Sequence, residues 1–316
     1  MNFSELIRSF PELTITGVTQ GSIYALVALG YTLVYGVLRL INFAHSEVFM
    51  IGTFAALFTW GLFGLDSNTA RPSLPVALLA IGAAIVIAAL ASAAIALFVE
   101  FIAYRPLRHR NAPPLAFLIT AIGASFLLME VVGALTVRRP FGVPALLPSE
   151  PVVDVGGWRV TPTQLTTVVV AIVMMVGLDW YVQRTRGGRG IRAVAQDVNT
   201  AALMGVNKGR VIALVFILGG LMAGVAAVFN DIKTGSTKFN VGFLLGLKAF
   251  SAAVLGGIGN LRGAALGGLL LGLVENYASA LFGSNWRDFV AFVALIVLLM
   301  FRPTGLLGES LGRARA

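Results

Sequence analysis

Four polar side chains that could form hydrogen bonds or ion pairs gather in the stretch INFAHSEVFMIG, residues 41–52: Asn42, His45, Ser46 and Glu47. At helical spacing Asn42, His45 and Ser46 share one face, whereas Glu47 points elsewhere. Exposing polar groups to lipid is costly, so we expect this face to contact the protein interior or a wet cavity. Two interpretations are open, a hydrogen-bond network that packs helices and a part of a transport pathway. Asn42 could also serve as the N-cap of a helix that begins at Phe43.

Further ionisable residues interrupt other apolar segments. Glu100 and Asp179 lie close to the ends of their segments, so we expect them to reach the membrane interface. Glu130, Lys248 and Glu275 lie deeper, where an ionisable side chain either pairs with another or marks a pathway. The sequence predicts no particular partner for Lys248, and a structural ion pair and an ion pathway are both open.

Motifs of known catalytic sites do not occur in the sequence. There is no cysteine, and His45 and His109 are the two histidines, so no metal site is expected. The patterns HExxH, GxSxG and the phosphate-binding GxxxxGK(S/T) do not occur either. We therefore predict a protein that is not an enzyme, has no catalytic residues and needs no cofactor. A nucleotide site, if ATP drives this protein, must lie on another polypeptide.

The composition is that of an integral membrane protein. Hydrophobic residues make up 58% of the 316 positions, charged residues 12%, and the mean hydropathy is +0.89, against roughly 25% charged residues in soluble domains. About 20 apolar residues span a bilayer as a helix. We predict an all-α polytopic membrane protein of about eight to nine transmembrane or re-entrant helices, from apolar runs at 12–38, 43–65, 75–104, 114–137, 163–183, 211–230, 242–258, 264–283 and 287–302.

The distribution of cations predicts an orientation. If every run crosses the membrane and the N-terminus lies outside, most of the 23 lysines and arginines fall on the inner side. This is the bias that cytoplasmic loops show, and it places the C-terminus in the cytoplasm. It also accounts for the net charge of +9 without nucleic acid as a partner.

Two long connections differ in chemistry. Residues 138–162 are rich in proline and glycine and predict an ordered external loop, either a hairpin or a short surface helix. Residues 184–210 carry six cations and one acid and predict a cytoplasmic pair of short amphipathic helices, with Asn199 capping the second and Gly205 ending it. This pair could lie on the lipid surface or bind a soluble partner. Its expected apolar stripe consists of Ile191, Val194, Ala195, Val198 and Ala202.

Glycines spaced four apart recur in the apolar runs and predict helices that pack closely. One stretch differs from the others, because residues 256–272 contain seven glycines around Asn260 and Arg262. A backbone this permissive, with polar residues between two apolar runs, favours a tight turn or a broken helix. Asn260, like Lys248, is a candidate for the translocation pathway or its gate.

Several of these blocks resemble a known family. The segments 21–57, 105–126, 189–228 and 247–275, which include Asn42-Phe43-Ala44-His45 and the stretch LKAFSAAVLGG, are similar to permease subunits of bacterial branched-chain amino acid ABC importers, the shorter of two paralogous permeases. The resemblance runs from about residue 17 to 308. It implies that residues 1–316 form a single transmembrane permease domain in the bacterial inner membrane.

The resemblance also implies partners: the paralogous second permease subunit, two cytoplasmic ATP-binding subunits and a periplasmic amino-acid-binding protein. Segment 190–205 corresponds in that family to the coupling loop that fits a groove on the ATPase. We expect the coupling residues to be Arg192, Ala195, Asp197, Asn199, Ala201 and Gly205.

Two positions depart from the family pattern. Ser46 stands where a glycine is usual, and Gln196 stands where an acidic residue often precedes Asp197. The resemblance leaves the solute open among branched-chain and other hydrophobic or neutral amino acids and related compounds. A secondary transporter or channel that works without an ATPase is the alternative function, although such proteins usually show coupling residues at the bilayer midplane and recognisable repeats.

Overall fold

The computed structural model describes residues 3–155 and 158–308. The order of the elements is α1 (Phe3–Leu38), α2 (His45–Leu62), α3 (Leu74–Val99), the π-helix η1 (Glu100–Tyr104), α4 (Arg105–His109), α5 (Pro114–Leu135), β1 (Phe141–Gly142), β2 (Val153–Val155), β3 (Trp158–Val160), α6 (Pro162–Arg184), α7 (Arg186–Gln196), α8 (Val198–Leu203), α9 (Lys208–Thr234), β4 (Ser236–Thr237), α10 (Val241–Gly256), α11 (Leu261–Phe282), η2 (Ser284–Trp286) and α12 (Arg287–Phe301).

The prediction of an all-α polytopic membrane protein is confirmed. Within the described residues, seven helical segments are long and apolar enough to cross a membrane: Ser9–Leu38, Leu74–His109, Pro114–Leu135, Pro162–Arg184, Lys208–Thr234, Leu261–Phe282 and Ser284–Phe301. The two remaining predicted runs also form helices, the shorter apolar α10 and α2, whose first turn carries the polar cluster. The C-terminus, which is predicted to lie in the cytoplasm, falls outside the described residues, because these end at residue 308.

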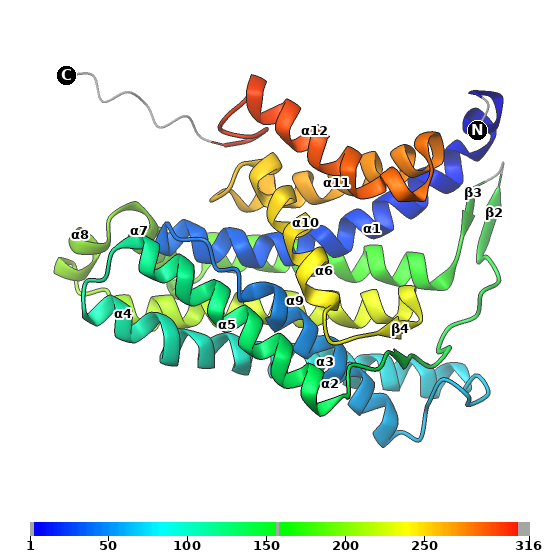
Figure 1. The fold of residues 1–316 in the computed structure, drawn as a ribbon, viewed down its shortest axis with the longest axis horizontal. Coiled ribbons are helices and arrows are strands. Elements are labelled where there is room, and N and C mark those ends of the chain that lie inside the picture. Colours follow the sequence, from blue (N-terminus) through cyan, green and yellow to red (C-terminus); the bar gives the residue numbers. More distant parts are fainter. Residues whose placement is uncertain (1–2, 156–157, 309–316) are drawn as a thin grey trace.

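Helices α1 and α9 form the interior of the bundle. Helix α1 runs along its length and packs against α11, α9, α10 and α6, while α9 also packs against α3 and α2 (Figure 1). Small residues permit this packing, as predicted: a Cβ at Gly268 would meet Ala25 of α1, and a Cβ at Gly272 would overlap the backbone of Gly21. Helices α3, α5, α6 and α12 expose large apolar side chains, as lipid-facing helices do.

The two ends of the bundle differ. Figure 1 shows α4, α7 and α8 gathered at one end, which we call the α7–α8 end, and β2 and β3 at the other, the hairpin end. Strands β2 and β3 pair as an antiparallel hairpin, so the hairpin expected within 138–162 is present. Residues 156–157 of that loop lie outside the described residues.

Two carboxylates lie elsewhere than the sequence suggested. Glu100 was expected at the interface but is buried, and its Oε1 lies 2.7 Å from Nη2 of Arg108, because the chain stays helical through η1 and α4 and returns that arginine to the same side. Glu130 was expected deeper, yet about half of its side chain is exposed, and it pairs with Arg138 just beyond the end of α5 at 2.5 Å.

The glycine-rich segment forms the predicted tight turn. Helix α10 ends at Gly256, and Gly257 and Gly259 have φ angles of 107° and 100°, which side-chain-bearing residues rarely adopt. Asn260 then accepts hydrogen bonds from the backbone N–H groups of Arg262 and Gly263 and so caps α11. The turn therefore reverses the chain within four residues between two membrane-embedded helices.

Candidate functional site

The four polar residues near the start of α2 are brought together and buried. Asn42, His45, Ser46 and Glu47 are each 4% exposed or less. Asn42 does not cap α2, contrary to one expectation: the helix begins at His45, its N-cap Ala44 makes no side-chain hydrogen bond, and the Asn42 Oδ1 accepts instead from the Tyr104 hydroxyl at 3.0 Å. The side chain of Asn42 therefore links the segment before α2 to η1.

The His45 ring fills a gap between α1 and α2. It lies edge-on to Tyr31, with the ring centroids 4.8 Å apart. A Cβ at Gly30 would overlap the imidazole, so the glycine makes room for the ring. His45 is thus held by packing, and its Nε2 has no hydrogen-bond partner among the described residues.

Glu47 lies with the serines, although the helical spacing suggested that it points elsewhere. The hydroxyls of Ser46 and Ser125 lie 3.2 and 3.3 Å from its Oε1, while its Oε2 has no partner among the described residues. Ser125 comes from α5, and the sequence carries no information about that contact. A cavity of about 40 Å³, which we call the Ser46 cavity, adjoins this group between Tyr31, Phe43, Ser46, Ser125, Phe126 and Phe243.

Lys248 lies in a second cluster, where α10, α11 and α12 meet. Its Nζ is 2.6 Å from Oε1 of Glu275 and 2.5 Å from Oδ1 of Asp288, and the Nε of Arg287 is also 2.6 Å from the same Glu275 oxygen. The Lys248–acid pair, one of the two possibilities that the sequence left open, is therefore present. Sequence reasoning noted Glu275 as a deep charge but did not single out Arg287 and Asp288, which lie at the start of α12 where they look like ordinary interfacial residues.

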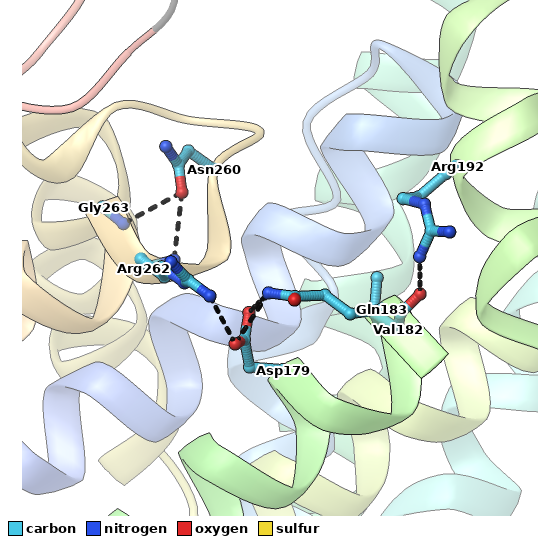
Figure 2. Close-up of polar contacts among 7 residues, drawn as sticks. All are labelled: Asp179, Val182, Gln183, Arg192, Asn260, Arg262 and Gly263. Carbon is cyan, nitrogen blue, oxygen red and sulfur yellow. Dashed lines mark hydrogen bonds and ion pairs between the residues drawn. The ribbon is translucent and has the colours of Figure 1, made fainter. Parts of the chain in front are cut away.

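Asn260 does not join either cluster. Besides capping α11, its Nδ2 donates to the backbone oxygen of Leu307 at 2.8 Å. Beside it, Arg262 reaches Oδ2 of Asp179 at 3.1 Å, and Gln183 also donates to Asp179 (Figure 2). These contacts tie the turn after α10 to the last turns of α6 at the α7–α8 end.

The segment 184–210 forms the predicted pair of short helices. Its caps differ from one expectation: Asp197, not Asn199, accepts from the backbone N–H of Thr200 at 2.7 Å and starts α8, whereas Asn199 lies inside that helix. The same N–H holds the pKa of the exposed Asp197 carboxyl below its usual range. Gly205 follows the helix with a φ of 83°, as its predicted role in ending the helix requires.

The pair buries one side and exposes the other. Ile191, Val194 and Ala201 are buried against the bundle, and Ala195 is partly buried. Val198 and Ala202, expected in the same apolar stripe, are exposed because the break at Asp197 turns α8 away from the bundle. Leu203 and Met204 are 88% and 80% exposed at the tip of the pair. The pair thus presents an apolar tip beyond the helix ends.

Two arginines fasten the pair to the membrane helices. Arg192 donates from α7 to the backbone oxygen of Val182 in α6 (Figure 2). Arg39, just after α1, donates through Nη2 to the backbone oxygen of Ala195 at 3.2 Å. Because Arg39 also precedes Asn42 by three residues, the short-helix pair is linked to the segment that leads into the α2 cluster.

Comparison with known proteins gives one consistent family. Residues 13–299 match the family model described as the permease component of branched-chain amino acid transport systems. The chain is 43% identical over 309 residues to the high-affinity branched-chain amino acid transport system permease protein BraD of Pseudomonas aeruginosa, covering 96% of this chain and 97% of the relative.

Two further relatives cover similar lengths. The high-affinity branched-chain amino acid transport system permease protein LivH of Escherichia coli K12 is 39% identical over 312 residues, 97% of this chain and 98% of the relative. A probable branched-chain amino acid transport permease protein LivH of Methanocaldococcus jannaschii is 25% identical over 300 residues, 92% of this chain and 90% of the relative.

Proposed function

This chain belongs to the family of branched-chain amino acid transport system permease components, and on that premise we propose that it forms half of the translocation pathway of an ATP-driven importer of branched-chain or closely related apolar amino acids. The protein is a multi-pass membrane permease and not itself a catalyst. Its other half would be a paralogous permease subunit, its motor a pair of cytoplasmic ATP-binding subunits, and its source of solute a periplasmic binding protein.

The observation that carries the coupling part of this proposal is the exposed tip of the α7–α8 pair. Leu203 and Met204 are large apolar side chains that are exposed on the surface of a segment otherwise rich in cations. An apolar centre with a polar rim is typical of a protein-binding surface. We assign this tip, together with Arg192, Ala195, Asp197, Asn199 and Gly205, to the surface that receives the ATP-binding subunit. Ala201, expected among these residues, is buried against the bundle and would support α8 from below.

The orientation follows from the same assignment. The α7–α8 end carries the cations of α4 and of segment 184–210, among them Arg105, Arg110, Arg186, Arg189 and Arg210. Cations favour the cytoplasmic side. We therefore place the α7–α8 end in the cytoplasm and the hairpin end outside the bacterial inner membrane, with the N-terminus outside.

The pathway itself would pass the α2 cluster. Ser46 and Ser125, which both contact Glu47, line the Ser46 cavity, and its other lining residues are aromatic or aliphatic. A few polar groups in an apolar wall provide a passage without a tight binding site. Asn42 and His45 would hold the cytoplasmic start of α2 in place, through Tyr104 and Tyr31 respectively.

Reconstitution in liposomes tests this function. The assembled complex should take up labelled leucine when ATP and the binding protein are supplied, and uptake should cease when a non-hydrolysable ATP analogue replaces ATP. This chain alone should give no uptake under either a proton or a sodium gradient. Uptake by the chain alone, driven by an ion gradient, would instead establish a secondary transporter.

A further inference from the structure

A wide cleft opens at the hairpin end of the bundle. It encloses about 820 Å³ between α5, α10 and the outer parts of α1 and α9. Its lining includes apolar side chains, among them Phe126 and Phe243, and polar ones, among them Gln20, Tyr24, Lys238 and Arg287. Its volume lies within the range of small-molecule sites.

Positive charge predominates around this cleft. Carboxylates close to it are already engaged, Glu130 with Arg138, and Glu275 with two cations at once. Lys233 donates to Gln20 of the cleft wall, and Lys238 is exposed and has no ion pair among the described residues. Four cations therefore line the cleft against one carboxylate: Arg138, Lys238, Lys248 and Arg287 against Glu130.

Arg287 is the cation best placed to bind an anion. Its Nε lies 2.6 Å from Oε1 of Glu275 in an ion pair without hydrogen-bond geometry, and about a third of its side chain remains exposed. Its two terminal nitrogens form no hydrogen bond with the described residues, and the residue lines the cleft. Those two nitrogens match the two oxygens of a carboxylate, a geometry that Lys cannot provide.

Two aromatic lining residues supply a surface for an aliphatic side chain. The rings of Phe126 and Phe243 are stacked with centroids 6.4 Å apart, and both residues also line the Ser46 cavity. The aromatic pair therefore lies between the wide cleft and the narrow cavity. A molecule with a carboxylate at one end and an aliphatic chain at the other matches this combination of cationic and apolar lining residues.

We propose that this cleft is a binding site for the amino acid before it passes the aromatic pair, with Arg287 holding its α-carboxylate, Lys238 adding attraction, and Phe126 and Phe243 receiving its aliphatic side chain. The proposal rests on the function proposed above, since it names where an imported amino acid first binds the permease. The α-ammonium group is assigned no protein partner at the site.

The test measures binding of labelled leucine to the assembled transporter in nanodiscs, without the binding protein. Two competitors separate the chemistry: 4-methylpentanoate keeps the carboxylate and the side chain, and leucinamide keeps the ammonium group and the side chain. We expect 4-methylpentanoate to displace leucine and leucinamide to compete at least about tenfold more weakly, as loss of a charge-assisted bidentate contact implies. Equal competition by the two compounds would overturn the proposal.

Variants identify the residue. Arg287→Met should weaken leucine binding about tenfold or more, and Arg287→Lys should weaken it less. Glu275 keeps Lys248 as a partner in both variants, which preserves the buried pair. Arg71→Met removes an exposed cation that lies at the same end but outside the cleft lining, and it should leave binding unchanged.

If Arg287→Met does not assemble, Lys238→Met takes its place. Lys238 is exposed and has no ion pair among the described residues, and its substitution should weaken leucine binding several-fold. The inference is wrong if Arg287→Met or its replacement binds leucine as tightly as the wild type does. It is also wrong if the variant binds leucine normally and only its affinity for the binding protein is reduced. In either case ATP-driven leucine uptake by the wild type still stands as evidence for the proposed function. Failure of wild-type uptake would refute that function instead.

Discussion

Lys248 of α10 and Glu275 of α11 form an ion pair of 2.6 Å, and the Glu275 side chain is fully buried. Lys248 is shared with Asp288 and Glu275 with Arg287, so four charges from three helices form one network. Charges withdrawn from water are retained only when they are paired. The network therefore joins α12, which exposes most of its surface, to the interior of the bundle.

Lys248→Met should destabilise the protein by up to the roughly 3–5 kcal/mol typical of breaking a buried ion pair. The loss is partly offset because Arg287 still contacts Glu275. Thermal unfolding in detergent should show a midpoint several degrees lower. Adding Glu275→Met to this variant should recover part of the loss, and a single variant as stable as the wild type would contradict the assignment of this network.

Tyr104→Phe removes the hydroxyl that donates to Asn42 and leaves the buried Oδ1 of Asn42 without a donor. The expected loss in the free energy of unfolding is about 1–3 kcal/mol, as for a buried polar group that loses its partner.

Asn42→Ala and His45→Ala should lower leucine uptake more than they lower the amount of protein in the membrane. Parallel losses of uptake and of protein would show that the α2 cluster only supports folding.

Asp197→Ala should fray α8, because the carboxylate accepts from the first turn of that helix. Asp197→Asn should preserve the helix, since asparagine also caps well, and Asn199→Ala is the matched control that removes no cap. Amide hydrogen exchange of residues 198–203 measures the difference. Equal exchange in the Asp197→Ala and Asn199→Ala variants would show that the cap has no effect on α8.

The lowered pKa of Asp197 adds a dependence on pH. The carboxyl is more acidic in the folded helix than in an unfolded chain, so its stabilising contribution is complete above the usual aspartate pKa and is lost only as the pH falls through the lower folded value. Exchange protection of α8 at neutral pH should therefore persist under mild acid. Loss of protection already above the usual aspartate range would contradict this sign.

Phe243→Ala should open the wide cleft to the Ser46 cavity, because the stacked pair with Phe126 lies between them. The chain contains no cysteine, so Ser46→Cys provides a single labelling site. A membrane-impermeant thiol reagent added from the hairpin side should label this cysteine several-fold faster in the Phe243→Ala background. Leu244→Ala, which shortens a neighbouring side chain of the cleft wall, serves as the control and should change the rate little.

The sequence was sufficient for the helices and for the local turns. Apolar length identified the helical runs, and the cluster of glycines around Asn260 identified the turn between α10 and α11, because both depend on residues adjacent in the chain. It was not sufficient for contacts between helices. Ser125 near Glu47, Tyr104 near Asn42 and Asp288 near Lys248 each come from another helix, and neither spacing nor hydropathy specifies which helices meet.

Local competition explains the remaining differences. Asp197 and Asn199 are both residue types that cap helices well. Asp197 is the cap, because its backbone is extended after α7 ends, as the N-cap position requires. Glu100 is buried because η1 and α4 prolong α3 and bring Arg108 back to it, a continuation that Pro106 in the sequence did not suggest. Tertiary contacts thus decided positions that local rules left open.

The measurement that tests the central claim most directly is site-specific crosslinking from the tip of the α7–α8 pair. Single cysteines replace Leu203, at the tip, or Leu135, which is 79% exposed at the hairpin end of α5, in a chain with no cysteine of its own. In the assembled transporter, Leu203→Cys should crosslink to the ATP-binding subunit and Leu135→Cys should not. Absence of any crosslink from position 203, or equal crosslinking from both positions, would contradict the account that this permease is driven through its α7–α8 pair.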